Sequence, residues 1–311
     1  MSGARYLGFD VGGQSVKAAL VDAAGNVVVS ESAPTGPATN GDSLVATFTD
    51  LHARMAGGHC DAIGVGIAGV LDAEGTLRGG PHLPELHGQR IAQIITAGMG
   101  VPATVRNDAD CAAMAEGWIG AAVGRTDYLA ITLGTGVGSG LVLGGQLRRG
   151  DSGYGCEFGH MIVEHQGLRC GCGNHGCLEA YISETATRRA VERAGKELHE
   201  RLLGGGVPEG GLARVVFEAA ARGDEQADDI VTSMIDHLGT AIASLINVVD
   251  LTAIVIGGGI APGVLARKNR LRQAIDASLF ARSVDAVDIL EAAGGPLAGA
   301  IGAARLAMLA R

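Results

Sequence analysis

Aromatic side chains are scarce in this 311-residue chain, at 3% of residues, and a run of basic residues is missing altogether. The formal net charge is −9. An acidic chain without a basic patch is repelled at long range by nucleic acid and by anionic membranes, so we expect neither as a partner. The longest apolar runs also fall short of the roughly 18 residues that a membrane-spanning helix needs.

A secretory signal is missing as well, because the stretch from Met1 to Asp10 has one arginine and a short apolar run that ends in a carboxylate. We therefore expect the protein to stay in the cytoplasm. Glycine is abundant, at 51 residues, but it follows no three-residue period, which excludes collagen and predicts many tight turns. Apolar residues make up 47% of the chain, enough for a sizeable core.

Periodicity and turn residues predict an alternation of strands and helices. Strands are expected at 6–10, 17–22, 27–31, 62–68, 103–105, 128–133, 140–143, 146–149, 253–256 and 287–290, with a hairpin at 70–77. Helices are expected at 44–55, 91–99, 107–118, 184–200, 212–222, 226–249, 265–279 and 297–310. The order strand, glycine turn, hairpin, helix occurs twice, about 120 residues apart, which indicates a duplicated α/β fold of two lobes with a cleft between them. The expected N-terminal lobe is 1–118, joined by the C-terminal helix at 297–311, and the expected C-terminal lobe is 119–296.

Glycine turns follow three of the predicted strands. In the first, Gly12 and Gly13 let backbone N–H groups face a phosphate, Asp10 is placed to hold Mg²⁺ through water, and Gln14 or Lys17 could reach phosphate oxygens. A plain hairpin turn is the alternative.

The second turn, with Gly134, Thr135 and Gly136, is rich enough in glycine and hydroxyl groups to form an anion-binding loop. It lacks the lysine of a Walker A loop and does not fit the dinucleotide fingerprint. The third turn, Gly257 to Gly259, allows an adenine or ribose to lie against the backbone. The alternatives are an ordinary turn for the second and a close strand–helix crossing for the third.

Asn107 and Asp108 follow a strand and open a helix. Both are common N-cap residues, which is the structural alternative to a role in a site. As a functional group, Asp108 is a candidate general base for a sugar hydroxyl, and we expect the helix N-terminus to favour its ionised form.

Three thiols crowd into eight positions at Cys170, Cys172 and Cys177. In a chain without an export signal this spacing favours a metal site over disulfides. His160 can complete a Cys₃His set, and His165 and His175 are rivals on spacing alone. Four protein ligands leave no open position, so the expected Zn²⁺ is structural. Free or disulfide-bonded cysteines are the alternative.

Glu157, His160 and Glu179 flank this cysteine segment, and such side chains suit the hydroxyl groups of a sugar. The segment Glu157-Phe158-Gly159-His160, followed by Cys170-x-Cys172-Gly173-x-x-Gly176-Cys177-x-Glu179, resembles the signature of the ROK family (repressors, open-reading-frame proteins and kinases). The family's other motifs occur in the same order, namely Asp10-x-Gly12-Gly13, Gly66-Ile67-Ala68-Gly69, Asn107-Asp108-Ala109, Leu133-Gly134-Thr135-Gly136 and Gly257-Gly258-Gly259.

The resemblance implies two ribonuclease-H-like lobes of the actin-like ATPase type and a kinase that phosphorylates glucose or a related hexose with MgATP, often as a homodimer. It implies that Asp108 is the base, and that the sugar contacts are Gly69, Asn107, Asp108, Glu157, His160 and Glu179. It also implies Zn²⁺ ligands at His160, Cys170, Cys172 and Cys177, with phosphate, Mg²⁺ and adenosine held by the three glycine turns.

Two positions depart from the family pattern. Gln14 stands where these kinases usually have threonine, and His82 stands where they commonly have asparagine, in His82-Leu83-Pro84. We expect glucose as the substrate, with an N-acetylhexosamine such as N-acetylmannosamine or N-acetylglucosamine as the alternative. The alternative to an enzyme is a non-catalytic sugar-binding regulator of the same family.

Overall fold

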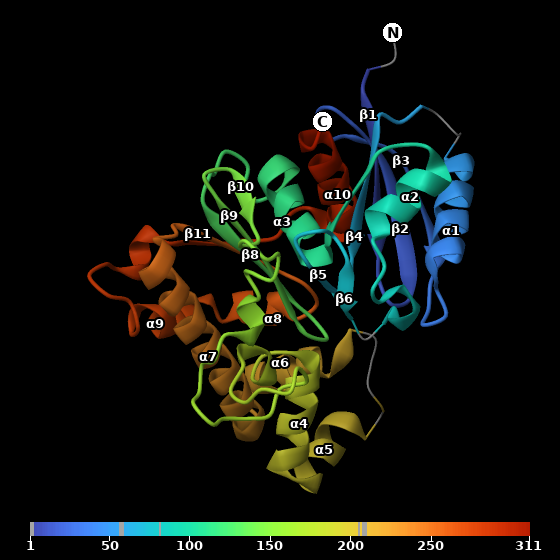
Figure 1. The fold of residues 1–311 in the computed structure, drawn as a ribbon. Coiled ribbons are helices and arrows are strands. Elements are labelled where there is room, and N and C mark those ends of the chain that lie inside the picture. The colour runs from blue at the N-terminus through green and yellow to red at the C-terminus, as the bar shows by residue number, and fades with distance from the viewer. Residues whose placement is uncertain (1–2, 56–58, 81, 205, 207–209) are drawn as a thin grey trace. The chain divides into compact units, whose positions relative to one another are not determined.

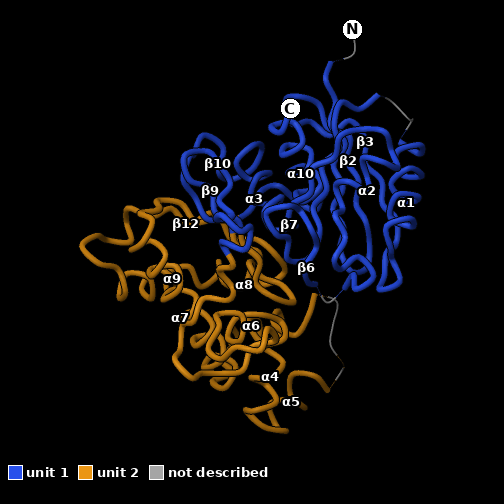
Figure 2. The backbone as a smooth tube through the Cα atoms, in the orientation of Figure 1, with its two compact units in different colours: residues 1–130, 140–156, 292–311 blue, residues 131–139, 157–291 orange. Residues whose placement is uncertain are grey.

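The computed structural model describes residues 3–55, 59–80, 82–204, 206 and 210–311. The chain divides into two compact units (Figure 2). The first holds residues 1–130, 140–156 and 292–311, and the second holds residues 131–139 and 157–291. The lobe boundaries expected from the sequence, after residues 118 and 296, stay a prediction.

The first sheet has five strands in the order β3-β2-β1-β4-β7. β1 is antiparallel to β2, and β2 to β3, so the first three predicted strands form an antiparallel meander. β4 is parallel to both β1 and β7. The strand bounds are Arg5–Val11 for β1, Ser15–Asp22 for β2, Val27–Pro34 for β3, Ala62–Ile67 for β4 and Ala103–Asn107 for β7.

Helices cover both faces of this sheet. Successive side chains of a strand point to opposite sides of the sheet, so β1 contacts a helix on each face. Phe9 of β1 stacks on Phe48 of α1, with ring centroids 3.7 Å apart. On the other face, Gly8 lies so close to α10 that a Cβ would be 1.8 Å from the carbonyl oxygen of Ala300. Figure 1 shows α10 beside β1 and β4. The four helices are α1 (Gly41–Arg54), α2 (Ile91–Met99), α3 (Asp108–Ile119) and α10 (Ala298–Leu309).

The second five-stranded sheet has the order β10-β9-β8-β11-β12. Each of its strands corresponds to a strand at the same place in the first sheet, which confirms the predicted duplication at the level of strand order. As in the first sheet, the outer pairs are one antiparallel pair and one parallel pair. The bounds are Tyr128–Leu133 for β8, Val137–Leu143 for β9, Gln146–Arg148 for β10, Ala253–Gly257 for β11 and Asp288–Glu291 for β12.

Six helices lie among the described residues of the second unit, and two predicted helices are each broken in two. The helix expected at 184–200 ends at Gly195, whose φ of 109° lies outside the helical region. The one expected at 265–279 starts earlier and is interrupted at Arg267. The helices are α4 (Glu184–Ala194), α5 (Lys196–Leu203), α6 (Gly211–Ala221), α7 (Glu225–Val249), α8 (Ala261–Ala266) and α9 (Lys268–Asp276).

Short elements complete the described chain. The predicted hairpin is formed by β5 (Val70–Leu71) and β6 (Leu77–Gly79). The 3₁₀ helices are η1 (Pro84–Leu86), η2 (Phe158–His160), η3 (Leu178–Ala180), η4 (Val284–Ala286) and η5 (Gly295–Leu297).

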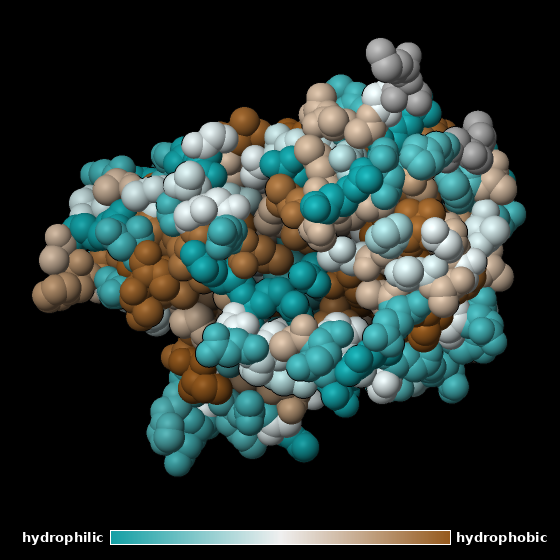
Figure 3. Space-filling view, turned by 45° about the horizontal axis from the view of Figure 1, so that its top comes forward, coloured by the Kyte–Doolittle hydropathy of each residue, from teal (hydrophilic) through white to brown (hydrophobic). Residues whose placement is uncertain are grey.

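Among the described residues, α7 is the one helix long and apolar enough to cross a bilayer. Half of its most apolar 18-residue stretch is buried inside the fold. Its inward residues, such as Leu238 and Ile242, are fully buried, and the helix packs against α6 and α9. Its outward side bears polar groups, including Asp236, which pairs with Arg270. α7 is therefore a core helix of the second unit. On the face drawn in Figure 3, hydrophilic residues are interspersed with hydrophobic ones.

Candidate active site and metal centre

The first glycine turn joins β1 to β2, with Asp10 directly opposite Lys17 in the strand pairing. The N–H of Gly12 donates to the carbonyl oxygen of Ser15 at 3.0 Å, which closes the turn. The ammonium of Lys17 donates to the backbone carbonyl of Pro296 at 3.0 Å, so its position is fixed by the segment that leads into α10. The side chain of Gln14 is exposed at the tip of the turn.

Burial raises the pKa of Asp10 to about 6 from its usual 3.8; the negative charge of Asp108 adds to this rise, and Lys17 opposes it. The two carboxylates therefore influence each other although 98 residues separate them in the sequence. This pair of acids, one near the end of β1 and one directly after β7, is the candidate active site of the first unit.

Asn107 caps α3 and also forms a hydrogen bond to Gly69, two residues after the end of β4. Its Oδ1 accepts hydrogen bonds from the N–H groups of Ala109 at 2.8 Å and Asp110 at 3.4 Å. Its Nδ2 donates to the carbonyl oxygen of Gly69 at 3.0 Å. The capping interpretation of Asn107 is confirmed, and the bond to Gly69 brings together two of the predicted sugar contacts.

Asp108 is the first residue of α3, and its carboxylate accepts the N–H of Ala109 at 3.0 Å. We expected the helix N-terminus to favour the ionised form. Burial outweighs that effect and raises the pKa of Asp108, while the backbone N–H and the nearby His82 act in the opposite direction. The carboxylate is thus more basic than one in water, which suits a group that accepts a proton.

The second glycine turn follows β8 in the second unit. The N–H of Val137 donates to Oε2 of Glu179 at 3.0 Å. A Cβ on Gly136 would lie 2.5 Å from the same oxygen, so a side chain at this position would displace the Glu179 carboxylate. The carbonyl of Gly134 accepts the N–H of Glu184 at the start of α4, at 2.9 Å. The turn is shorter than the predicted loop, because β9 already begins at Val137.

The third glycine turn packs on the end of the same strand, β8. Gly258 has a φ of 90°, and a Cβ there would be 2.3 Å from the carbonyl oxygen of Leu133. The N–H of Ile260 donates to that oxygen at 3.1 Å. The second and third turns, Gly134–Gly136 and Gly257–Gly259, therefore lie side by side at one end of the second sheet.

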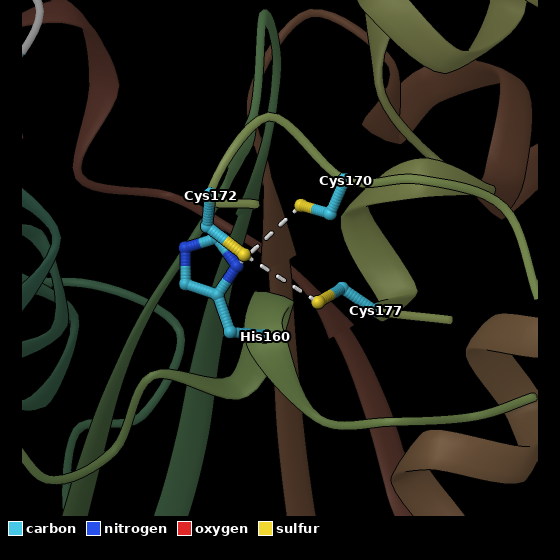
Figure 4. Close-up of side chains that lie close together, drawn as sticks. All are labelled: His160, Cys170, Cys172 and Cys177. Atoms are coloured by element: carbon cyan, nitrogen blue, oxygen red, sulfur yellow. Dashed lines mark hydrogen bonds between the residues drawn. The ribbon is translucent and has the colours of Figure 1, made fainter. Parts of the chain in front are cut away.

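The cysteine segment gathers four metal-binding side chains (Figure 4). The ligand atoms of His160, Cys170, Cys172 and Cys177 all lie within 4.8 Å of one another. All six cysteines are among the described residues and none forms a disulfide, which excludes the disulfide alternative in this structure. Within the described residues, His165 and His175 lie outside this group, so the geometry selects His160 among the three candidates.

The spacing of the four atoms fits a tetrahedral ion. Ligands bonded to Zn²⁺ at about 2.0–2.3 Å are separated from one another by about 3.5–3.8 Å. The sulfurs of Cys172 and Cys177 are 3.7 Å apart, and the sulfur of Cys170 is 3.8 Å from Nδ1 of His160. The donor set therefore fits Zn²⁺, and the bound ion itself stays a prediction.

Glu179 connects this cluster to the second glycine turn. Its Oε1 lies 3.6 Å from the sulfur of Cys170, and its Oε2 accepts the N–H of Val137. Glu157 is exposed just before η2, and its carbonyl accepts the N–H of His160 at 2.9 Å. The predicted sites thus fall into two groups, one in each unit.

Three features of the first unit escaped the sequence reasoning. The ring of His82 lies against Gly13, where a Cβ would be 2.7 Å from it. Gly299 lies equally close to Asp10, with a Cβ position 2.6 Å from the carboxyl carbon. The buried carboxylate of Glu116 accepts the N–H groups of Ala121, Ala293 and Gly294 and fixes the approach to α10. Only the first of these three features had a signal in the sequence, namely the departure from the family pattern at His82.

A family model described as the ROK family matches residues 6–309. The chain belongs to the ROK family. The glucokinase of Streptomyces coelicolor is 32% identical over 308 residues, which cover 97% of this ROK chain and 96% of that protein. The N-acetylmannosamine kinase of Escherichia coli O1:K1 is 31% identical over 308 residues, or 97% of each chain.

Solved structures agree with this assignment. The ROK hexokinase of Thermus thermophilus matches with a TM-score of 0.83 and 30% identity over 98% of each chain. The ROK family glucokinase of Streptomyces griseus, solved in complex with glucose and AMPPNP, matches with a TM-score of 0.79 and 32% identity over 98% of this chain and 100% of that one. This ROK chain accordingly has the actin-like ATPase fold and is an ATP-dependent sugar kinase, so the predicted family, fold and enzyme class are confirmed.

Proposed function

We propose that this ROK kinase transfers the γ-phosphoryl group of ATP to a hexose, with glucose as the sugar and its O6 as the acceptor. The observation that carries the mechanism is Asp108, a carboxylate whose pKa is raised by burial beside Asp10 at the first glycine turn. A base of this kind orients the attacking hydroxyl and contributes about 10²–10⁴-fold to the rate.

In this mechanism the sugar hydroxyl donates its hydrogen bond to the carboxylate of Asp108. Its oxygen forms a bond to the γ-phosphorus as the bond from that phosphorus to the bridging oxygen of ADP breaks. The hydroxyl proton passes to Asp108, and the phosphate ester and ADP leave. Because phosphoryl transfer has a loose transition state, positioning and charge neutralisation supply most of the catalysis.

The phosphate groups are assigned to the glycine turns. The phosphates would face the side chains of Gln14 and Lys17 and the backbone N–H groups of Gly12, Gly13, Gly134, Thr135 and Gly136. The adenosine would lie against the third turn, formed by Gly257, Gly258 and Gly259. Asp10 would hold Mg²⁺ through water, and that ion supplies the positive charge that phosphoryl transfer needs. The hydrogen bond from Lys17 to Pro296 suggests that this side chain mainly sets the charge around Asp10.

The sugar is assigned to Gly69, Asn107, Asp108, Glu157, His160 and Glu179. These groups include acceptors and donors, which a polyhydroxyl substrate needs on every face. Zn²⁺ held by His160, Cys170, Cys172 and Cys177 would have no catalytic role. It would brace the segment that carries Glu157 and Glu179, since structural zinc contributes folding free energy.

An N-acetylhexosamine is the second candidate substrate. The glucokinase and the N-acetylmannosamine kinase are almost equally similar to this chain, at 32% and 31% identity over the same length. Overall identity therefore does not separate the two sugars. His82, which departs from the family pattern, contacts Gly13 and influences Asp108, so it is the position where a different acceptor would be recognised.

The test is a coupled assay of ADP release with MgATP and a panel of glucose, mannose, fructose, N-acetylglucosamine and N-acetylmannosamine. We expect the highest kcat/KM with glucose and a product phosphorylated at O6, as read by ³¹P and ¹³C NMR. A higher kcat/KM with an N-acetylhexosamine would replace glucose by the second candidate. No turnover with any sugar, in protein that binds ATP, would contradict the proposed reaction.

A further inference from the structure

Three arginines line a hollow in the second unit, beside the cysteine segment. The hollow has a volume of about 450 Å³ and is lined by Leu168, Arg169, Cys170, Gly171, Ala180, Arg189 and Arg193. This volume lies within the range of small-molecule sites. None of its lining residues is acidic, in a chain whose net charge is −9.

The arginines come from two elements that the fold brings together. Arg169 precedes the first zinc-ligand candidate, Cys170, and Arg189 and Arg193 lie one turn apart on α4. One N–H of Arg189 donates to the backbone carbonyl of Arg169 at 3.0 Å, which leaves the other donors of its guanidinium group available. All three side chains are exposed to solvent.

Like charges four residues apart on a helix repel each other. Elsewhere in the described chain, several exposed helical arginines pair with an acid at that spacing, as Arg54 does with Asp50 and Arg214 with Glu218. Arg189 and Arg193 have each other instead. Between residues that the structure describes, no ion pair to Arg169, Arg189 or Arg193 is formed within 4.0 Å.

We propose that this hollow is a binding site for a small phosphate-bearing molecule, separate from the glycine turns. Guanidinium groups bind phosphate oxygens in pairs of parallel hydrogen bonds, and three of them around one hollow match a doubly charged anion. An adjoining hollow of about 230 Å³ shares Leu168, Ala180 and Arg193 and is lined partly by apolar side chains, including Ile230 and Met234. The organic part of a phosphorylated metabolite has room there, although Asp229 on its rim disfavours a second anionic group.

A molecule bound in this hollow would contact the cysteine segment close to Glu179, one of the proposed sugar contacts. Cys170 and Ala180 line the hollow, and Ala180 directly follows Glu179. A phosphate bound to Arg169 on one side and to α4 on the other would cross-link the cysteine segment to the helix. This further site does not depend on which sugar the kinase phosphorylates.

The experiment is a calorimetric titration of the zinc-containing full-length protein with inorganic phosphate and with glucose 6-phosphate. Glucose and a non-hydrolysable MgATP analogue are present at saturation, so that phosphate sites at the glycine turns are already filled. We expect one further equivalent to bind, with an affinity that falls as the salt concentration rises. Binding of both probes would identify phosphate itself as the recognised group, and binding of glucose 6-phosphate alone would identify the phosphosugar.

The decisive variant is Arg189→Gln combined with Arg193→Gln, which we expect to weaken binding at least tenfold, because charge-assisted hydrogen bonds to two guanidinium groups are lost. Arg188→Gln is the matched control, since Arg188 lies on the same helix but outside the hollow. Arg193→Gln alone should weaken binding about threefold or more, and it serves if the double variant loses zinc or helical structure.

Unchanged affinity in both the double and the single variant would overturn the proposal, as would the absence of a further binding event in the wild type. A third result would overturn it in another way. If the double variant changed the oligomeric state while the wild type bound no additional phosphate, the arginines would face a second copy of the chain.

Discussion

Gly299 of α10 faces the carboxylate of Asp10 so closely that a Cβ on residue 299 would lie 2.7 Å from its Oδ2. The C-terminal helix thus limits the space available to the carboxylate of Asp10, the residue proposed to hold Mg²⁺. Since α10 also packs against β1, a side chain at this position must displace either the helix or the carboxylate.

We therefore predict that Gly299→Ala lowers the free energy of unfolding by about 1–3 kcal/mol, the usual cost of overpacking. It should also raise the KM for MgATP through the displaced Asp10. Urea unfolding and steady-state kinetics measure the two effects. Gly3→Ala is the control, because nothing lies within 4 Å of a Cβ there, and equal behaviour of the two variants would contradict the predicted contact.

Replacing Asp108 tests the assignment of the general base. Asp108→Asn keeps an oxygen for the N–H of Ala109 but cannot accept the hydroxyl proton, so kcat should fall by about 10²–10⁴-fold while sugar still binds. Fluorescence or calorimetric titration with the sugar checks binding independently of turnover. Asp42→Asn is the control, as Asp42 lies in the first turn of another helix. A variant with near-normal kcat would show that another group accepts the proton.

The raised pKa of Asp10 predicts a particular dependence of stability on pH. Because its pKa is about 6 in the folded protein and about 4 in an unfolded chain, the folded state binds the proton more tightly. Asp10 therefore favours folding most at low pH, and this contribution is lost as the pH rises from about 4 to about 6. Chemical unfolding at intervals of one pH unit gives the free energy of unfolding of the wild type and of Asp10→Asn. The wild-type value minus the Asp10→Asn value should decrease as the pH rises from about 4 to about 6. A constant difference between the two free energies would mean that the pKa of Asp10 is not raised.

The metal centre predicts about one zinc ion per chain, measurable by elemental analysis of the purified protein. Cys177→Ser should lose that zinc and lower the thermal midpoint, because a buried ligand of a structural site is removed. Cys60→Ser, which changes another buried cysteine far from the cluster in sequence, should keep it. Properly folded wild-type protein without zinc, purified in the absence of chelators, would refute the metal assignment.

Glu179 links Cys170, a predicted zinc ligand, to the second glycine turn, which makes Glu179→Gln informative. The amide oxygen can still accept the N–H of Val137, so the fold should be kept. The lost charge should weaken the sugar hydrogen bond and raise the KM for sugar about tenfold, with a smaller change in the KM for MgATP. Glu184, whose carboxylate accepts the N–H of Ala213 in the first turn of α6, serves as the control in Glu184→Gln. Equal effects on both KM values would mean that Glu179 acts only through the turn.

Local signals in the sequence predicted much of this fold. Glycine turns after apolar runs located the ends of β1, β8 and β11, and the helix 91–99 was predicted with its observed bounds. The cysteine spacing located the metal cluster because all its ligands lie within 18 residues, from His160 to Cys177. Such signals depend only on neighbours along the chain.

Features that depend on distant parts of the chain could not be predicted in this way. The pKa of Asp108 follows from burial, which the sequence of one helix N-terminus does not determine. The contact of Gly299 with Asp10 spans nearly the whole chain. The break at Gly195 was also missed, since the periodicity of the flanking residues continues through it.

The two duplicated sheets differ most in one connection. Between β3 and β4 the chain has residues 35–61 with α1, whereas between β10 and β11 it has residues 149–252, which include the metal cluster and α4 to α7. The segment that carries Glu157, His160 and Glu179, three of the proposed sugar contacts, is thus inserted as a single block between two strands of the second sheet. The first glycine turn is closed by the bond from Gly12 to Ser15, whereas the second accepts the N–H of Glu184 and donates to Glu179, so a replacement block must supply these two partners for the second turn to keep its form.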